Sequence, residues 1–350
     1  MDSIVTEHSL LTQLESSWPL AQWQGLTVVV AISGGADSVS LAHALSVLAG
    51  RGEARLVLAH FDHRWREESV EDARFVEQLA GQLGWKFVQG QAVEPGVQSE
   101  QLARRQRYAF LLDVARSEGA RFVVTAHTAD DQVETILDRI LRGTGLRGLA
   151  GIPRTRVLDE GIVLLRPLLC CSQSDLRQYL AELGQPWRED PSNQDTDFTR
   201  NRIRQVLLPL LRSEFQPSVE ESLRNLAELA GQTQQFLGQL AGELAAAAVT
   251  VERDHEQETV TVSLPAVAPA APLVVREMLV ETWCQLSWPR QAMGMRQWNL
   301  LEEMLLDPAA PGQQTFPGNV LATRDEKKSG GQLKLTRRLE NASSEQLPGN

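Results

Sequence analysis

The stretch TVVVAISGGADS, residues 27–38, joins an apolar run to a turn of two glycines, and the helical pattern VSLAHALSVL follows at once. A buried strand, a tight turn and a helix start can form an anion site. Glycine lets backbone N–H groups approach a phosphate, and the helix start carries partial positive charge. We therefore predict a phosphate-binding loop made of Ser33, Gly34, Gly35, Ala36, Asp37 and Ser38. The loop is neither a Walker A motif nor GxGxxG.

Asp37 is the informative residue of this loop. A phosphate repels a nearby carboxylate unless a cation lies between them, so we predict that Asp37 binds Mg²⁺. The alternative interpretation is structural. In that case Gly34 and Gly35 only make a strand-to-helix turn, and Asp37 or Ser38 caps the helix.

Short apolar runs alternate with amphipathic stretches between residues 27 and 211. The runs are TVVVAI, RLVLAHF, WKFV and RFVVTAH. This alternation predicts an α/β fold with a doubly wound parallel sheet covered on both faces. Three of the runs end in the polar clusters SGGADS, HFDH and AHTADD. Because ligands bind at the carboxyl ends of parallel strands, we expect the three clusters to form one site.

The length of 350 residues favours two domains. Ser218 and Glu221 have capping-box spacing, which predicts a new helix after Pro217. We predict a catalytic domain over 1–215, a helical linker and smaller α+β domain over 216–338, and a disordered tail over 339–350. Within the second domain we expect a hairpin near 253–258, helices near 274–284 and 291–306, and two short strands joined by the turn FPGN.

Composition is that of an ordinary globular protein, with 42% hydrophobic and 23% charged residues. No apolar run approaches the ~20 residues that cross a bilayer, and the N-terminus lacks a secretory pattern, so we expect a cytosolic protein with no membrane partner. Cys170, Cys171 and Cys284 give neither a disulfide framework nor a zinc pattern.

The net charge of −11 argues, taken alone, against a nucleic-acid partner. Arginines are nevertheless concentrated in 139–166 and in 200–204. On charge alone, these local patches are as consistent with solvated surface and structural ion pairs as with RNA contact.

The SGGxDS loop resembles the pyrophosphate-binding loop of the N-type ATP pyrophosphatases (the PP-loop superfamily). Further motifs, in the same order along the chain, resemble those of tRNA(Ile)-lysidine synthetases. They are His60-Phe61-Asp62-His63-Arg64, an ExxARxxRY stretch over 100–108, an AHxxDDxxET stretch over 126–135, Leu141-Arg142-Gly143-Thr144-Gly145, Arg166-Pro167-Leu168-Leu169, and Asp190-Pro191-Ser192-Asn193 followed by Arg200-Asn201-Arg202-Ile203-Arg204. In the first of these, the basic residue follows the second histidine immediately, unlike the HxxHxxR spacing of the family.

This resemblance implies an adenine nucleotide alpha hydrolase-like fold and a ligase that uses ATP and Mg²⁺. The substrates implied are L-lysine and the tRNA(Ile) with a CAU anticodon, whose wobble cytidine is adenylated on the C2 oxygen and then attacked by the lysine ε-amine. The products are lysidine, AMP and diphosphate. The resemblance also raises the expectation of a homodimer.

Asp131 and Glu134 share one face of a predicted helix, where carboxylates could recognise lysine or remove its proton. His127, just before that helix, is a further catalytic candidate at the strand end. Each has a structural alternative: Thr128 and Asp131 have capping-box spacing, and a lone histidine at a strand end is usually only hydrogen-bonded. His60 is assigned to nucleotide contact.

Four arginines are candidates for stabilising the α-phosphate during AMP transfer, because a guanidinium forms a planar fork. They are Arg104, Arg107, Arg200 and Arg202. Two functional alternatives stay open: a tRNA cytidine thiolase of the same superfamily, although adjacent cysteines do not suit it, and a regulator that holds ATP without transferring AMP.

Overall fold

The computed structural model describes residues 9–65, 69–92, 100–189, 199–325 and 330–339. The chain packs as two compact units, Met1–Gly231 and Gln232–Asn350. Each unit has its own hydrophobic core.

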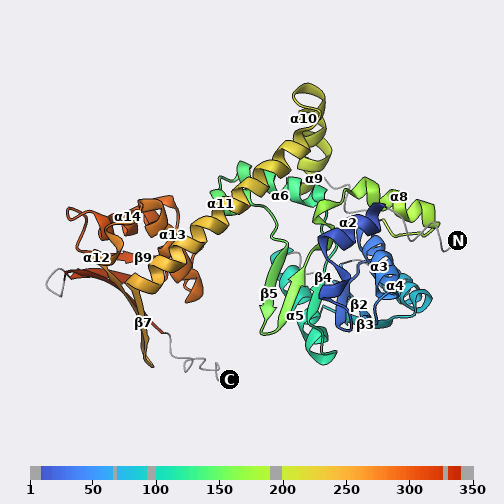
Figure 1. The fold of residues 1–350 in the computed structure, drawn as a ribbon, viewed down its shortest axis with the longest axis horizontal. Coiled ribbons are helices and arrows are strands. Elements are labelled where there is room, and N and C mark those ends of the chain that lie inside the picture. Colours follow the sequence, from blue (N-terminus) through green and yellow to red (C-terminus); the bar gives the residue numbers. More distant parts are fainter. Residues whose placement is uncertain (1–8, 66–68, 93–99, 190–198, 326–329, 340–350) are drawn as a thin grey trace, which may run out of the picture. The chain divides into compact units, whose positions relative to one another are not determined.

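The first unit contains a six-stranded sheet of order β3-β2-β1-β4-β6-β5 (Figure 1). Neighbouring strands from β3 to β6 run parallel, and β5 pairs antiparallel with β6 at the edge. The predicted α/β fold with a doubly wound parallel sheet is confirmed. The strands are β1 Thr27–Ala31, β2 Arg55–Asp62, β3 Lys86–Gln91, β4 Phe122–Val124, β5 Thr155–Asp159 and β6 Ile162–Leu165.

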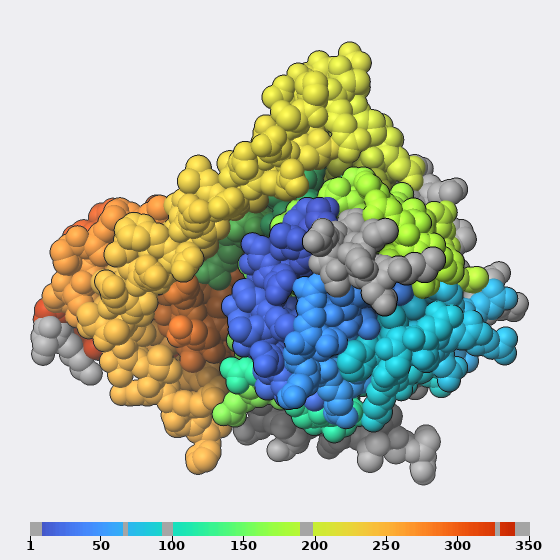
Figure 2. Space-filling model, turned by 45° about the vertical axis from the view of Figure 1, so that its right-hand side comes forward, coloured from blue at the N-terminus to red at the C-terminus, as the bar shows by residue number. Residues whose placement is uncertain are grey.

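Alternation along β1 explains why both faces of the sheet are covered. Val28 and Val30 enter one core, while Val29 enters the core on the opposite face, and all three are fully buried. The first face is covered by α2 Ser9–Ser17, α3 Ala36–Ala49, α4 Ser69–Leu83 and α8 Gln173–Leu183, which Figure 2 shows side by side from dark blue to lime. The second face packs against α5 Glu100–Ser117.

Short elements complete the first unit. They are η1 Leu20–Gln22, α6 Ala129–Leu141, α7 Leu146–Leu149, η2 Pro167–Cys170, α9 Thr199–Arg202, the π-helical turn η4 Ile203–Leu207, and α10 Leu208–Glu214. The β5–β6 hairpin was not predicted, because its first strand, TRVLD, is largely exposed and lacks an apolar run.

The division between the units falls inside α11, a helix of 30 residues over Val219–Ala248. The helix begins directly after Ser218, as the capping-box spacing predicts. A linker and tRNA-positioning role for residues 216–338 stays a prediction, and residues 340–350 of the predicted tail lie outside the described part.

The second unit is built on an antiparallel sheet of order β7-β8-β11-β10-β9. Helices α12 Leu264–Val267, α13 Pro272–Gln285 and α14 Met295–Leu306 pack against it with Trp283, Trp288 and Trp298 in the core. The predicted hairpin, both predicted helices and the strands around FPGN are all present. The strands are β7 Val249–Arg253, β8 Gln257–Ser263, β9 Gln313–Phe316, β10 Val320–Asp325 and β11 Gln332–Arg338.

Within the described ranges, no helix combines the length and apolar character that crossing a membrane requires.

Glu258 is a buried carboxylate in the second core, and its Oε2 accepts a hydrogen bond of 2.8 Å from Trp288 Nε1. Replacing Trp288 by Phe should lower the unfolding free energy of this unit by about 2 kcal/mol, since the lost bond is to a charged group. Trp85→Phe is the matched control, because Trp85 Nε1 donates over 2.8 Å to the neutral hydroxyl of Ser46. It should cost about 1 kcal/mol.

Hydrogen-exchange mass spectrometry under increasing denaturant measures both costs on peptides from each unit. Equal losses in the two variants would contradict a charged, buried Glu258.

Candidate active site

The predicted phosphate loop lies between β1 and α3, at the carboxyl edge of the sheet. Gly34 has φ of +93°, a conformation that a side chain rarely adopts, and a Cβ there would lie 3.4 Å from Phe75 Cδ1. Gly35 precedes the first turn of α3, which no side chain of the described residues caps. The hydroxyls of Ser33 and Ser38 lie 3.2 Å apart inside the loop. The loop therefore presents backbone and hydroxyl donors at a helix start.

Arg188 holds this loop from the side. Its backbone N–H donates to the Gly34 carbonyl over 2.9 Å. Its guanidinium pairs with Asp72 at 2.9 Å and with Glu71 at 3.1 Å, both in the first turn of α4. The loop is thus connected to the helix that covers β2 and β3.

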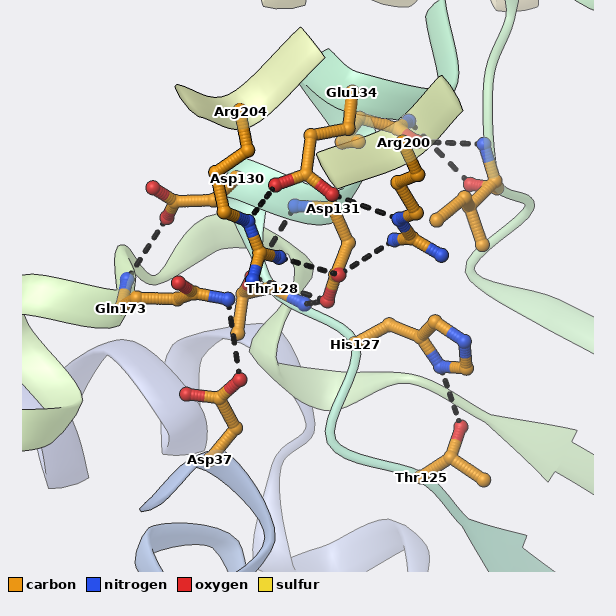
Figure 3. A network of polar contacts seen from close by, with 12 residues as sticks. Asp37, Thr125, His127, Thr128, Asp130, Asp131, Glu134, Gln173, Arg200 and Arg204 are labelled. Carbon is orange, nitrogen blue, oxygen red and sulfur yellow. Dashed lines mark hydrogen bonds and ion pairs between the residues drawn. The ribbon is translucent and has the colours of Figure 1, made fainter. Parts of the chain in front are cut away.

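Asp37 stands in the first turn of α3, and its Oδ2 accepts a bond of 3.3 Å from Gln173 Nε2 (Figure 3). Burial raises the pKa of Asp37 to about 7, and the charges of Asp131 and Asp130 raise it further against the effects of Arg177 and Arg204. The raised pKa marks a concentration of negative charge that a cation would relieve.

Asp131 makes the capping box that its spacing predicted. Thr128 N donates to Asp131 Oδ2 over 2.8 Å, and Asp131 N donates back to Thr128 Oγ1 over 3.3 Å. The other oxygen, Oδ1, accepts from Arg200 Nη2 at 2.6 Å. Asp131 therefore caps the helix with one oxygen and faces the site with the other.

Glu134 is only 1% exposed and lies between two arginines (Figure 3). Arg200 Nε donates to its Oε2 over 2.7 Å, and Arg204 Nε donates to its Oε1 over 2.5 Å. These pairs connect α6 to α9 and the π-helical turn. A buried carboxylate requires such partners to remain charged.

The structure thus brings Arg200 to the carboxylates and leaves Arg202 exposed. Arg204, which was not among the candidates, pairs with Glu134 instead. The DxSN part of the last family motif, residues 190–193, lies outside the described residues.

His127 lies beside this network, and Figure 3 shows its ring directed toward Thr125, whose hydroxyl is 3.0 Å from Nδ1. Burial lowers the pKa of His127 to about 3; Asp131 acts in the opposite direction, and the charges of Arg166, Arg107 and Arg104 lower it further. The imidazole is therefore neutral at pH 7.

His60, predicted to contact nucleotide, is buried at the end of β2. Its Nδ1 donates to the Ile32 carbonyl over 2.9 Å, which fixes its ring against the strand that leads into the phosphate loop. A nucleotide contact by the opposite ring nitrogen stays a prediction.

Arg104 and Arg107 lie against the ring of Tyr108, with Cζ atoms 5.2 Å and 5.5 Å from the ring centroid, and their contact with the α-phosphate stays a prediction. Arg156 lies over the same ring at 4.7 Å. Neither Arg156 nor the buried Arg166 was among the candidates, although both stand in the arginine-rich stretch.

Removing the charge of Glu134 tests the buried network. Glu134→Gln should lower the unfolding free energy of the first unit by about 3 kcal/mol, since it leaves arginines facing a neutral amide in a buried site. Glu220→Gln is the matched control, because Glu220 pairs with the half-exposed Arg212 on the surface. It should cost less than about 1 kcal/mol. Denaturant unfolding measures both, and equal costs would contradict the buried pairing.

The raised pKa of Asp37 predicts a pH-dependent stability. At pH values between the ordinary pKa of an aspartate, 3.8, and about 7, Asp37 is protonated in the folded chain and ionised in the unfolded chain. The stability that this proton contributes is therefore lost as the pH rises through the window. Without Mg²⁺ or nucleotide, Asp37→Asn should therefore raise Tm relative to the parent chain at pH 8 and not at pH 4, by roughly 2–4 °C per kcal/mol gained.

Asp254→Asn should behave oppositely and lose stability at pH 8, because backbone N–H groups of Glu256 and Gln257 lower the pKa of Asp254. Scanning calorimetry measures both series. A constant Tm difference for Asp37→Asn between pH 4 and 8 would rule out the raised pKa.

Comparison with known proteins assigns the chain to a family. The PP-loop domain family matches residues 8–211. The tRNA(Ile)-lysidine synthase of Deinococcus deserti is 44% identical over 65% of this chain and 41% of its own length. The corresponding proteins of Nostoc sp. and Rhodopirellula baltica are 39% and 34% identical, over 65% and 86% of this chain and 67% and 85% of their own lengths.

The solved structure of a U34-tRNA thiolase, NcsA, from Methanococcus maripaludis has a TM-score of 0.54 at 14% identity, over 63% of this chain and 78% of that one. It shows a shared fold. The chain spans about half the length of several curated relatives it matches. The match over most of the first unit, together with the relatives that are covered over two thirds or more of their length, shows that the chain belongs to the tRNA(Ile)-lysidine synthase family of PP-loop proteins.

Proposed function

We propose that this chain is a tRNA(Ile)-lysidine synthetase, a ligase that forms a carbon–nitrogen bond. ATP adenylates the C2 oxygen of the wobble cytidine in tRNA(Ile) with a CAU anticodon, and the ε-amine of L-lysine then displaces AMP to give lysidine. Diphosphate is released in the first step.

One observation carries this proposal: the carboxylates of Asp131 and Glu134 lie next to the phosphate loop, bridged by Arg200. Burial is the main cause of the raised pKa of Asp37, and the charge of Asp131 raises it further, so the two carboxylates lie near enough to interact. A lysine ε-amine is cationic until it loses its proton, and carboxylates beside a nucleotide loop suit both its binding and its deprotonation.

ATP and Mg²⁺ fit the groups at this edge. The loop from Ser33 to Ser38 would hold the pyrophosphate half of ATP, and Asp37 would hold Mg²⁺ shared with the phosphates, where the ion neutralises charge developing on them. Among the described residues no three His, Cys, Asp or Glu side chains gather into a metal site. A magnesium ion that relies on phosphate and water oxygens needs no such group.

Arg200 is placed to act in both steps. All four oxygens of Asp131 and Glu134 already accept hydrogen bonds, from Thr128, Arg200 and Arg204. A lysine ammonium entering here competes with these donors, and Arg200 is the more exposed of the two arginines, at 44% of its side chain against 33% for Arg204. On leaving the carboxylates, its guanidinium is free to contact the α-phosphate.

The imidazole of His127 is neutral near pH 7, and this limits the role it can have in the site. With a pKa of about 3, the ring cannot supply a proton as an imidazolium near pH 7. We propose that the neutral ring orients the target base through its Nε2, while Thr125 holds Nδ1.

The wider predictions of the sequence belong to the same proposal. They are a tRNA-positioning role for residues 216–338, a homodimer, a cytosolic location, and site roles for His60, Arg104, Arg107 and Arg202. A thiolase is disfavoured by its cysteine chemistry. Cys170 and Cys171 are adjacent in the chain with sulfurs 3.7 Å apart, and they do not provide the separated cysteine pairs that such chemistry generally requires.

Mass analysis of the wobble base tests the function. After incubation of the tRNA(Ile) transcript with ATP and lysine, the base should carry the added mass of lysine, and diphosphate release should depend on lysine. Asp37→Asn should lower the rate by about 100- to 1000-fold, as expected for a lost electrostatic group.

Asp113→Asn is the matched control, because Asp113 is 75% exposed on α5. It should leave the rate unchanged. An unmodified base with parent enzyme would exclude lysidine synthesis, and full activity of Asp37→Asn would exclude its role at Mg²⁺.

A further inference from the structure

Four arginines surround the ring of Tyr108, and we call them the arginine box: Arg104, Arg107, Arg156 and Arg166. The first three have Cζ atoms within 5.5 Å of the ring centroid. Arg166 is 2% exposed, and its Nη1 donates to the Pro153 carbonyl over 2.6 Å. The box combines side chains from α5, from the edge strand β5 and from the end of β6.

Three of the four box arginines have no acidic partner among the residues that the structure describes. Within the described ranges, no carboxylate lies within ion-pair distance of Arg104, Arg156 or Arg166. The buried Nε of Arg166 has no hydrogen-bond acceptor there. Burial lowers the pKa of Arg166, and the like charges of Arg104 and Arg156 act in the same direction. Such a cluster is stabilised when an anion enters it.

The sheet places the box beside the active site. Thr125 N donates to the Leu165 carbonyl over 3.1 Å, so Arg166, the next residue, stands at the same strand edge as His127. The sheet order sets β4 between β1 and β6. His127 therefore lies between the box on one side and the phosphate loop with Asp37 on the other.

We propose that the arginine box binds an RNA phosphodiester next to the nucleotide that is modified. The phosphate loop already accounts for the ATP phosphates, and the acids Asp131 and Glu134 account for the lysine amine. Arg104 and Arg156 are exposed on two different elements, while Arg166 forms the buried floor, so a polyanion can be contacted from the surface. Planar guanidinium forks suit phosphate oxygens.

This inference rests on the proposed function for its substrate, but its test does not require catalysis. Binding of the unmodified tRNA(Ile) transcript is measured without ATP or lysine, as a function of salt. Arg156→Gln and Arg104→Gln should each weaken binding about tenfold and lower the slope of log K against log salt by about 0.7, the loss of one phosphate contact.

Arg121→Gln is the matched control. Arg121 is exposed and precedes β4, at the amino edge of the same sheet. Its replacement removes one positive charge, as in the other variants, but at a distance from the site. Binding and salt slope should equal those of the parent chain.

The KM values for ATP and lysine show which anion the box binds: an RNA phosphodiester, the lysine carboxylate or the nucleotide. Unchanged KM values for ATP and lysine in Arg156→Gln, together with weaker tRNA binding, support a phosphodiester. A raised KM for lysine would assign the box to the lysine carboxylate, and a raised KM for ATP would assign it to the nucleotide; either would overturn the proposal. The proposal would also be overturned if Arg156→Gln and Arg104→Gln bound tRNA as tightly as the control Arg121→Gln. If the box binds tRNA but no lysidine forms, only the proposed function fails.

Discussion

A carboxylate as buried as that of Glu134 stays charged only if cations lie against it, and this requirement organises the site. Arg200 and Arg204 meet both of its oxygens and thereby fix α9 and the π-helical turn against α6. Asp131, one turn earlier on α6, shares Arg200 and also caps the helix. The position of these two carboxylates is therefore determined by the ion pairs and not by apolar packing alone.

Charge is segregated along the edge of the sheet. Acidic side chains gather between the phosphate loop and α6, where burial, and then the charges of Asp131 and Asp130, raise the pKa of Asp37. Arginines gather beyond β4 around Tyr108, whose pKa reflects burial opposed by Arg104 and Arg107 and lies below its usual value. His127 stands between the two regions and is neutral. The lysine amine and the RNA phosphodiester that we propose as ligands would meet opposite charges on the two sides.

Much of this arrangement could be predicted from the sequence, because local rules set it. The short β-branched run 27–32 suits a strand covered on both faces, and the glycine at 34 supplies the positive φ that the loop requires. Thr128 and Asp131 form their capping box through contacts three residues apart. These features depend on near neighbours, which a sequence displays directly.

Long-range pairing could not be predicted in the same way. Arg200 and Arg204 stand four residues apart on the helical segment α9–η4 and share one side, while Arg202 is exposed. Their partner Glu134 lies on α6, 66 residues before Arg200, and local spacing does not identify it. The β5–β6 hairpin carries Arg156 and Arg166 to Tyr108 across about fifty residues of chain, and its first strand, β5, has no apolar run that would predict a strand. These contacts join segments far apart in the chain, so tertiary packing and not local propensity determines them.

The amino ends of helices α3, α6 and α8 lie close together. The first begins at the phosphate loop, and the other two open with capping boxes at Thr128 and Ser172. The amino end of α8 is linked to both others, because Gln173 N donates to Asp130 and Gln173 Nε2 donates to Asp37. Each start contributes about half a positive charge. Their summed field lets a cluster of carboxylates persist there while still attracting a polyphosphate, so neutral backbone contributes much of the electrostatics of this catalytic edge.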